Sequence, residues 1–189
     1  MSEKVKYPLH EAATIAKEVL SKLEPFCSKA CIAGSIRRMK SYVGDAELLV
    51  IPKWAEVLNE GEMFKSQVNL LEREIQSLIA CQYFELRKKI NGTVTDGHAV
   101  KLLRHIKSGI PVDIFFTTPE NWISALVCRT GGKTNNEEIA RRAKTIGYRW
   151  KMSGAGFYDP ESEIMYRMKS EEELFQFVGL PYLQPEERN

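Results

Sequence analysis

Apolar residues near the start of the chain recur every three or four positions. This is the period of one face of an α-helix, and it predicts a helix from residue 9 to residue 24. Short apolar runs then predict strands at 29–34 and 45–52, the second of which ends at a proline. Helical spacing returns further on and predicts a second helix over 63–79. The first part of the chain therefore alternates between helix and strand.

The middle of the chain has the patterns of antiparallel strands. Two strands are predicted at 83–90 and 98–106, with an Asn-Gly turn signal between them at 91–92. A second hairpin passes through the Ser-Gly pair at 108–109 and places Asp113 near the middle of an otherwise apolar strand. A buried carboxylate is unfavourable unless it is paired or bound to a metal ion, so Asp113 is a candidate for chemistry.

The last third of the chain begins with two helical patterns. One helix is predicted over 119–129 and another over 134–148. In the second helix, Thr134 and Glu137 have the spacing of a capping box. Gly147 lies where a glycine often ends a helix.

Short strands and turns follow over 148–168, and Ser170 is the predicted cap of a closing helix over 170–180. No repeat or flexible linker interrupts the chain, and we place a subdomain boundary near residue 120. The predicted fold class is α+β, with a mixed sheet and helices over 1–120 and a small α/β subdomain over 121–189.

The composition excludes several classes of protein. Of the 189 residues, 43% are hydrophobic and 28% are charged, which is usual for a globular protein. The chain has no apolar run long enough to span a membrane, and its start lacks the apolar core of a signal peptide. The four cysteines form no C-x-x-C pair, and with three histidines they do not suggest a zinc site. We therefore expect a protein of a reducing compartment, cytoplasmic or nuclear, that is neither secreted nor membrane-bound.

The net charge of +2 says little, but the positive residues are clustered. Such clusters can neutralise a phosphate backbone, although each can equally be a solvated basic face. The first cluster consists of Arg87, Lys88, Lys89, Lys101, Arg104 and Lys107. The second consists of Arg129, Lys133, Arg141, Arg142, Lys144, Arg149 and Lys151. From the second cluster we predict DNA contacts by Arg129, Lys133, Arg141 and Arg142.

Asp45 and Glu47 are the strongest candidates for catalysis. Residues two apart on a strand leave the same face, so these carboxylates lie together, and Asp113 joins them if its strand is a neighbour. Three carboxylates suit Mg²⁺, and two such ions can activate a 3′-hydroxyl and stabilise a leaving pyrophosphate. The alternatives are a solvated strand edge for the pair and a satisfied buried acid for Asp113.

A Gly-Ser turn precedes the acidic pair. Gly34 and Ser35 expose backbone N–H groups and a hydroxyl that can bind a phosphate, and Arg38 can supply the matching positive charge. A phosphate site beside a metal site is what nucleotidyl transfer requires. An ordinary turn is the alternative for this segment alone.

In this order, the motifs resemble the family X DNA polymerases. The segments "GSIRR" and "GDAE" at 34–38 and 44–47 resemble the family's nucleotidyltransferase signature, and "VDIFFTTPENW" resembles its third acidic strand. "TGGKTNNEEIARRAKTIGY", "GFYD" and "GLPYLQPEER" resemble its C-terminal part. The resemblance extends over about residues 9–189, with the weakest support between 53 and 95.

This resemblance implies a catalytic palm over 1–120 followed by a subdomain over 121–189 that holds the nucleotide and the nascent base pair. It implies a minimal form, similar to small viral members, without a lyase domain. Two Mg²⁺ ions, for which Mn²⁺ can substitute, would be bound by Asp45, Glu47 and Asp113. Nucleotide-binding roles fall on Gly34, Ser35, Arg38, Gly44, Thr130, Gly131 and Asn136.

Three features of the sequence depart from the family pattern. Glu47 stands where aspartate is usual, and its extra methylene displaces a metal ligand. Cys128 and Arg129 replace an aromatic pair that is associated with sugar discrimination. Ala140 replaces an arginine that checks the template, so the preference for deoxyribonucleotides and the dependence on a template stay open.

We expect a monomeric, metal-dependent DNA polymerase that adds nucleotides to a 3′ end and releases pyrophosphate, in short-gap repair. Its partners would be a nucleoside triphosphate and primer–template or gapped DNA. Two alternatives remain: a nucleotidyltransferase acting on RNA ends or another acceptor, and a catalytically impaired nucleic-acid-binding protein.

Overall fold

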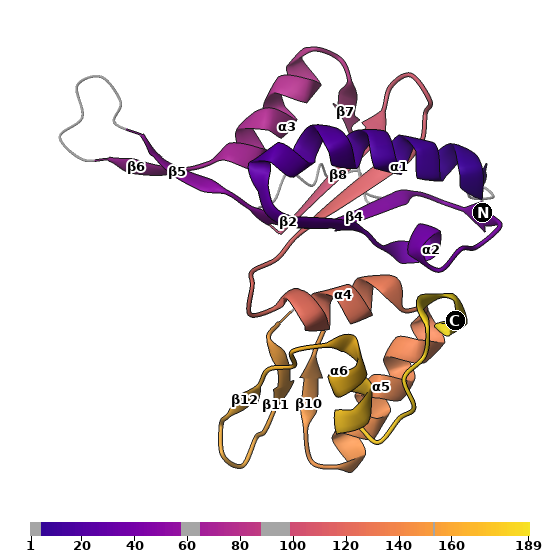
Figure 1. Cartoon of the computed structure of the whole chain (residues 1–189), viewed down its shortest axis with the longest axis vertical. Helices are drawn as coiled ribbons and strands as arrows, with labels where there is room; N and C mark the ends of the chain where they lie inside the picture. The colour runs from indigo at the N-terminus through magenta and orange to yellow at the C-terminus, as the bar shows by residue number, and fades with distance from the viewer. Residues whose placement is uncertain (1–4, 58–64, 88–98, 153) are drawn as a thin grey trace.

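The computed structural model describes residues 5–57, 65–87, 99–152 and 154–189 (Figure 1). The upper part in Figure 1 contains β1 (Tyr7–Pro8), α1 (Leu9–Leu23), η1 (Glu24–Phe26), β2 (Cys27–Ile32), α2 (Gly34–Arg37), β3 (Tyr42–Val43), β4 (Ala46–Pro52), β5 (Trp54–Val57), β6 (Ser66–Asn69), α3 (Leu70–Ala80), β7 (Phe84–Leu86), β8 (Val100–His105) and β9 (Pro111–Phe116). The lower part contains α4 (Trp122–Thr130), α5 (Lys133–Thr145), β10 (Arg149–Lys151), β11 (Gly156–Tyr158), β12 (Met165–Tyr166), α6 (Glu171–Phe177) and η2 (Pro185–Glu187).

A five-stranded mixed sheet forms the centre of the upper part. Its strand order is β2-β4-β9-β8-β7. β4 and β9 run parallel, whereas the other neighbouring strands are antiparallel. The two predicted hairpins are present as β7–β8 and β8–β9, and the turn predicted at 91–92 lies outside the described residues. The predicted α+β fold with a mixed sheet is confirmed.

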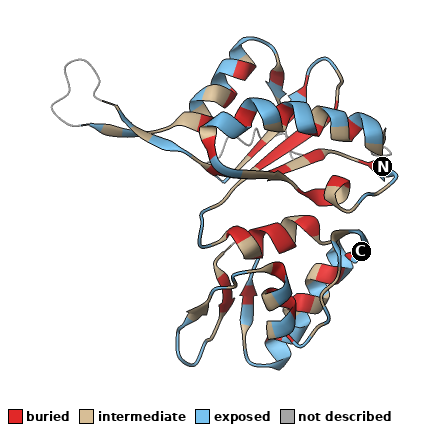
Figure 2. Ribbon diagram, in the orientation of Figure 1, coloured by how far each residue is buried: buried red, intermediate tan, exposed pale blue. Residues whose placement is uncertain are grey.

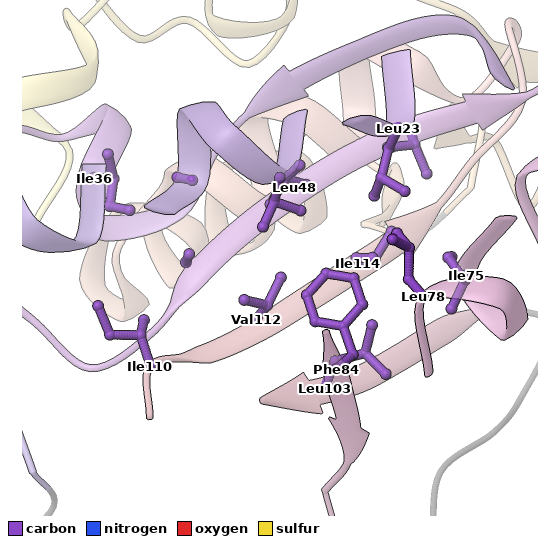
Figure 3. Packing of buried hydrophobic residues seen from close by; sticks show 14 of the residues in the cluster. Leu23, Ile36, Leu48, Ile75, Leu78, Phe84, Leu103, Ile110, Val112 and Ile114 are labelled. Atoms are coloured by element: carbon purple, nitrogen blue, oxygen red, sulfur yellow. The ribbon is translucent and has the colours of Figure 1, made fainter. Parts of the chain in front are cut away.

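β4 is buried on both of its faces, which explains its unbroken apolar run. Leu48 and Val50 belong to the core beneath α1 and α3, where Leu48 lies among the side chains shown in Figure 3. Leu49 and Ile51 pack instead against α4 on the opposite face of the sheet. Because side chains alternate along a strand, Glu47 leaves β4 on the α4 face.

The lower part has an aromatic core of its own. The rings of Phe157 and Phe177 are stacked with their centroids 4.6 Å apart. Trp150 is buried and donates a hydrogen bond of 2.9 Å to the Ser124 hydroxyl. Figure 2 shows that α4, which lies between this core and the sheet, is buried along most of its length. The boundary that we predicted near residue 120 falls between β9 and α4.

The predicted helix over 63–79 is wrong at its start. Residues 63 and 64 lie outside the described residues, and Ser66–Asn69 form β6, which pairs with β5. α3 begins at Leu70, after Asn69 accepts a 3.1 Å hydrogen bond from the backbone N–H of Glu72. The apolar spacing continues through β6, but pairing with β5 makes that segment a strand.

The capping box predicted for the helix at 134–148 is also wrong. α5 begins at Lys133, so Thr134 lies within its first turn, and no side chain caps this helix. Its N-terminus contacts the C-terminal segment instead, where the backbone oxygen of Asn189 accepts a 2.9 Å hydrogen bond from the backbone N–H of Asn135. A partner distant in sequence has replaced the local cap. The predicted C-terminal glycine is confirmed, since Gly147 has a φ of +91°.

Candidate active site

The three predicted carboxylates lie on neighbouring elements of the sheet. Asp45 directly precedes β4, and Glu47 is the second residue of that strand. The parallel register pairs Glu47 with Asp113, near the middle of β9. The strand order and register therefore bring together acids that are more than sixty residues apart in the chain.

Glu47 and Asp45 open into a polar cavity of about 570 Å³ between the sheet and the lower part of the molecule. The cavity collects seven of the residues predicted to bind metal, nucleotide or DNA, together with two others. Its lining residues are Ser35, Arg38, Asp45, Glu47, Cys128, Arg129, Gly131, Gly132 and Lys133. Acids of the upper part and basic side chains of both parts thus face one cavity.

The carboxyl group of Glu47 is poorly solvated and lies near other acids. Burial raises its pKa to about 7, and repulsion by Asp45 and Asp113 adds to this shift. The charges of Arg129 and Arg38 act in the opposite direction but do not cancel it. A group with this perturbation inside a cavity is typical of a functional site.

Gly34 makes room for Glu47. A Cβ atom at Gly34 would lie 2.2 Å from Oε2 of Glu47, closer than any non-bonded contact allows. Gly34 also has a φ of +62°, which residues with a side chain rarely adopt. Residues 34–37 form the short helix α2 rather than the predicted turn, and Ser35 in this helix faces the cavity.

Asp113 differs from the other two acids because an arginine already binds it. It is 9% exposed and forms an ion pair with Arg87, which follows β7. Arg87 was predicted as part of a basic cluster, and the structure places it directly after β7 beside an acid. Lys88 and Lys89 of that cluster lie outside the described residues.

Several predicted nucleotide ligands instead contact protein groups. Arg38 donates a 2.6 Å hydrogen bond to the carbonyl oxygen of Thr130. The Thr130 side chain is fully buried. The side-chain amide of Asn136 donates a 2.8 Å hydrogen bond to the carbonyl oxygen of Cys128 and a longer one, of 3.5 Å, to the carbonyl oxygen of Gly131. These contacts shape the turn at 130–132.

Gly44, the remaining predicted nucleotide ligand, lies between β3 and β4, and a Cβ atom added there would have no other atom within 4 Å.

The predicted DNA contacts divide into two groups. Arg129 and Lys133 line the cavity, whereas Arg141 and Arg142 lie on α5, where both bind the carboxylate of Glu138.

A buried ionic cluster joins the upper and lower parts, and the sequence did not reveal it. Glu171 accepts hydrogen bonds of 2.8 Å from both terminal nitrogens of Arg37. Arg188 binds the other side of the same carboxylate at 2.9 Å and 3.3 Å, and it is completely buried. Arg37 also donates to the Thr130 hydroxyl at 2.7 Å. Arg37 is visible in the sequence motif, but Glu171 has the appearance of an ordinary acid in the first turn of a helix.

The donor set suits a hard divalent cation. Mg²⁺ is commonly held by one or two carboxylates together with substrate phosphates and water. Asp45 and Glu47 provide two such carboxylates on the wall of a polar cavity. Within the described ranges, no group of three or more potential ligands is assembled. The residues therefore fit a cation that a bound substrate helps to hold.

Comparison with known proteins supports the fold and the relationship. The family model for the DNA polymerase beta thumb matches residues 125–189. The chain is similar to human DNA-directed DNA/RNA polymerase mu, with 32% identity over 80 residues, which are 42% of this chain and 16% of that protein. It is 24% identical to DNA nucleotidylexotransferase of Monodelphis domestica over 187 residues, covering 84% of this chain and 36% of the relative. The chain thus spans well under two thirds of these relatives.

The fold also matches the crystal structure of Leishmania infantum polymerase beta in a ternary P/T complex. The TM-score is 0.72 at 20% identity, and the match covers 98% of this chain and 77% of that one. Among the described residues, none of the helices is both long and apolar enough to cross a membrane. The thumb match and the two curated relatives make this chain similar in sequence to family X polymerases, and the solved structure shows that it has the fold of polymerase beta.

Proposed function

We propose that this chain is a metal-dependent nucleotidyltransferase that extends the 3′ end of DNA and releases pyrophosphate. The observation that carries this proposal is the single cavity in which Asp45 and Glu47 face Ser35, Arg129 and Lys133. Acids that can hold a cation and groups that can bind a triphosphate lie together there. The names of the relatives, which are polymerases and a nucleotidylexotransferase, agree with this activity.

We assign separate roles in metal binding and phosphate binding to the residues of the cavity, according to their chemistry. Asp45 and Glu47 would hold the divalent cation, with phosphate oxygens completing its coordination. When bound, this cation activates the 3′-hydroxyl and stabilises the leaving pyrophosphate. The hydroxyl of Ser35, the N-terminal N–H groups of α2 and the ammonium of Lys133 would bind the phosphates. Asp113, on the strand beside Glu47, would join the metal site on release from Arg87.

We further propose that the acceptor is primer–template DNA or a short gap. α4, α5 and the turn at 130–132 form one wall of the cavity, where a nucleotide bound to the acids would meet its neighbours. Asn136 at the start of α5 holds this turn in place.

Untemplated addition is the second candidate function. One of the relatives is a DNA nucleotidylexotransferase, and α5 has Ala140 where the family resemblance implies an arginine that checks the template. Arg141, the next residue, binds Glu138. An enzyme without that contact would depend less on a template.

Primer extension tests both functions. A labelled primer is offered alone, on a template and in a one-nucleotide gap, with Mg²⁺, Mn²⁺ or EDTA. Extension in Mg²⁺ that follows the template, and fills the gap best, supports the polymerase. Equal extension of the single strand supports untemplated addition. DNA binding without extension in either metal, by a protein shown to be folded, contradicts both and supports a non-catalytic nucleic-acid-binding protein.

A further inference from the structure

Arg129 occupies an unexpected position in the cavity. Its guanidinium lies over the ring of Phe115, with Cζ 3.8 Å from the ring centroid. Phe115 is on β9, two residues after Asp113, and it pairs in register with Leu49 of β4. Residues two apart share a face, so Phe115 and Asp113 lie on the face from which Glu47 also emerges. The stack therefore places a positive charge beside the acids.

The backbone on both sides of Arg129 is fixed. The carbonyl oxygen of Cys128 accepts the 2.8 Å hydrogen bond from Asn136, and that of Thr130 accepts the 2.6 Å hydrogen bond from Arg38. The Thr130 hydroxyl accepts a third bond, from Arg37. Hydrogen bonds fix the neighbours of Arg129, and its side chain is stacked on an aromatic ring. The guanidinium therefore has a defined position in the cavity.

The other arginines of the site are directed differently. Arg87 binds Asp113, and Arg38 binds the backbone of Thr130. Arg129 lines the same cavity as Asp45 and Glu47. Unit charges that share a partly buried site interact more strongly than they do in bulk water, enough to alter the binding of a third charge.

We infer that Arg129, held on Phe115, is a built-in counter-ion of the acidic cavity that weakens the binding of divalent cations until a nucleotide is present. The guanidinium balances part of the negative charge of Asp45 and Glu47, so a divalent cation that enters the nucleotide-free cavity meets repulsion. A triphosphate brings negative charge that offsets this repulsion. Arg129 would thus be a positioning residue that makes occupancy of the metal site depend on the substrate. This inference rests on the proposed function for the identity of the cation and the nucleotide.

Mn²⁺ binding to the nucleotide-free protein tests this inference without turnover. Free Mn²⁺ is measured by electron paramagnetic resonance during titration of the wild type, Arg129→Gln and Arg129→Met. Both variants remove the charge, and methionine keeps an apolar side chain against the ring. We expect each folded variant to bind Mn²⁺ about tenfold more tightly than the wild type. Arg129→Lys keeps the charge and should remain close to the wild type.

Arg73→Gln is the matched control, because it removes one positive charge from an exposed position on α3. Its Mn²⁺ affinity should equal that of the wild type. Unchanged or weaker Mn²⁺ binding by both neutral variants overturns the inference. An equal gain in Arg73→Gln also overturns it, since the effect would then follow net charge. Primer extension by the wild type is a separate result, so the inference can fail while the proposed function stands.

Discussion

Glu171 and Glu47 are both largely buried glutamates, but their surroundings are opposite. Two arginines bind Glu171 directly, one of which is completely buried. Glu47 faces a polar cavity beside two other acids, and no arginine binds it directly among the contacts of the described residues. Burial raises the pKa of both carboxyls, but the hydrogen bonds from Arg37 and Arg188 reverse this for Glu171 and lower its pKa below the usual value.

The difference separates a charge that is matched within the fold from one that is not. Glu171 has its partners in the folded protein, so its ionised form helps to hold the upper and lower parts together. Glu47 has a shortage of positive charge in this state, which a cation and a substrate can supply. The same residue type therefore stabilises the fold in one region and makes the other region ready to bind.

The largest expected effect is the loss of stability in Glu171→Gln. The amide cannot balance two arginines, and breaking a buried ionic cluster by removing one member typically costs about 3–5 kcal/mol. Urea denaturation at neutral pH would measure this loss. Glu172→Gln, at the adjacent exposed position, should change the free energy of unfolding little. Equal stability of the two variants would show that the cluster does not hold the parts together.

Glu47→Gln should lower activity and leave stability intact, the reverse of Glu171→Gln. We expect nucleotide addition to fall by about 10²–10³-fold, equivalent to roughly 3–4 kcal/mol of barrier, because a cation ligand is lost. The fold should be retained, and its stability at pH 8 should equal or exceed that of the wild type, because the change removes repulsion with Asp45 and Asp113. Single-turnover primer extension and urea denaturation measure the two quantities. A folded variant with near-normal turnover would exclude Glu47 from the metal site.

The two glutamates should also give opposite dependences of stability on pH. The pKa of Glu47 is raised to about 7, so between the unfolded value near 4.5 and pH 7 the folded state binds more protons. Stability should therefore fall by on the order of 2–3 kcal/mol as pH rises through this window in metal-free buffer. Glu47→Gln should remove this slope.

Because the pKa of Glu171 is lowered, its contribution is present above the unfolded value and is lost as pH falls below about 4.5. Glu171→Gln should remove the loss of stability below about pH 4.5. It should leave the fall in stability between pH 4.5 and pH 7 unchanged. A wild-type profile that rises steadily from pH 5 to pH 8 would contradict the assignment for Glu47.

A smaller effect is expected from the contact between Gly34 and Glu47. Gly34→Ala places a side chain at a positive φ, which costs about 1–2 kcal/mol, and its Cβ displaces the Glu47 carboxylate. Glu47→Asp shortens the acid and should relieve the second effect but not the first. In a double-mutant cycle, Gly34→Ala should therefore cost less stability and activity in the Glu47→Asp background. Additive losses would mean that the two residues act independently.

The smallest effect is expected on α5. Arg141 is bound by Glu138, so Arg141→Gln should lower DNA affinity less than twofold and leave its salt dependence unchanged. Lys133 lines the cavity, and Lys133→Gln should reduce the salt slope by about one. Fluorescence anisotropy over a range of salt concentrations measures both slopes. A large effect of Arg141→Gln would mean that DNA displaces Glu138.

The pattern of apolar residues predicted most of the secondary structure because it reflects local geometry. The first helix, the β8–β9 hairpin and the closing helix with its Ser170 cap follow from side-chain periodicity and from contacts within a few residues. The same-face placement of Asp45 and Glu47 follows from the alternation of a strand. The helix predicted over 63–79 failed at its start because the residues of β6 pair with β5, and the capping box of α5 failed because the distant C-terminal segment caps that helix instead.

The sequence by itself determined which acids, glycines and basic residues are available to the site and that the acidic pair shares a face. Tertiary structure decided how their charges are matched. Arg37 and Glu171 are 134 positions apart, and Arg129 meets Phe115 only because α4 packs across the parallel strands β4 and β9. The physical reason is that a charge acts through space, so its effect depends on burial and on neighbours that spacing along the chain does not specify.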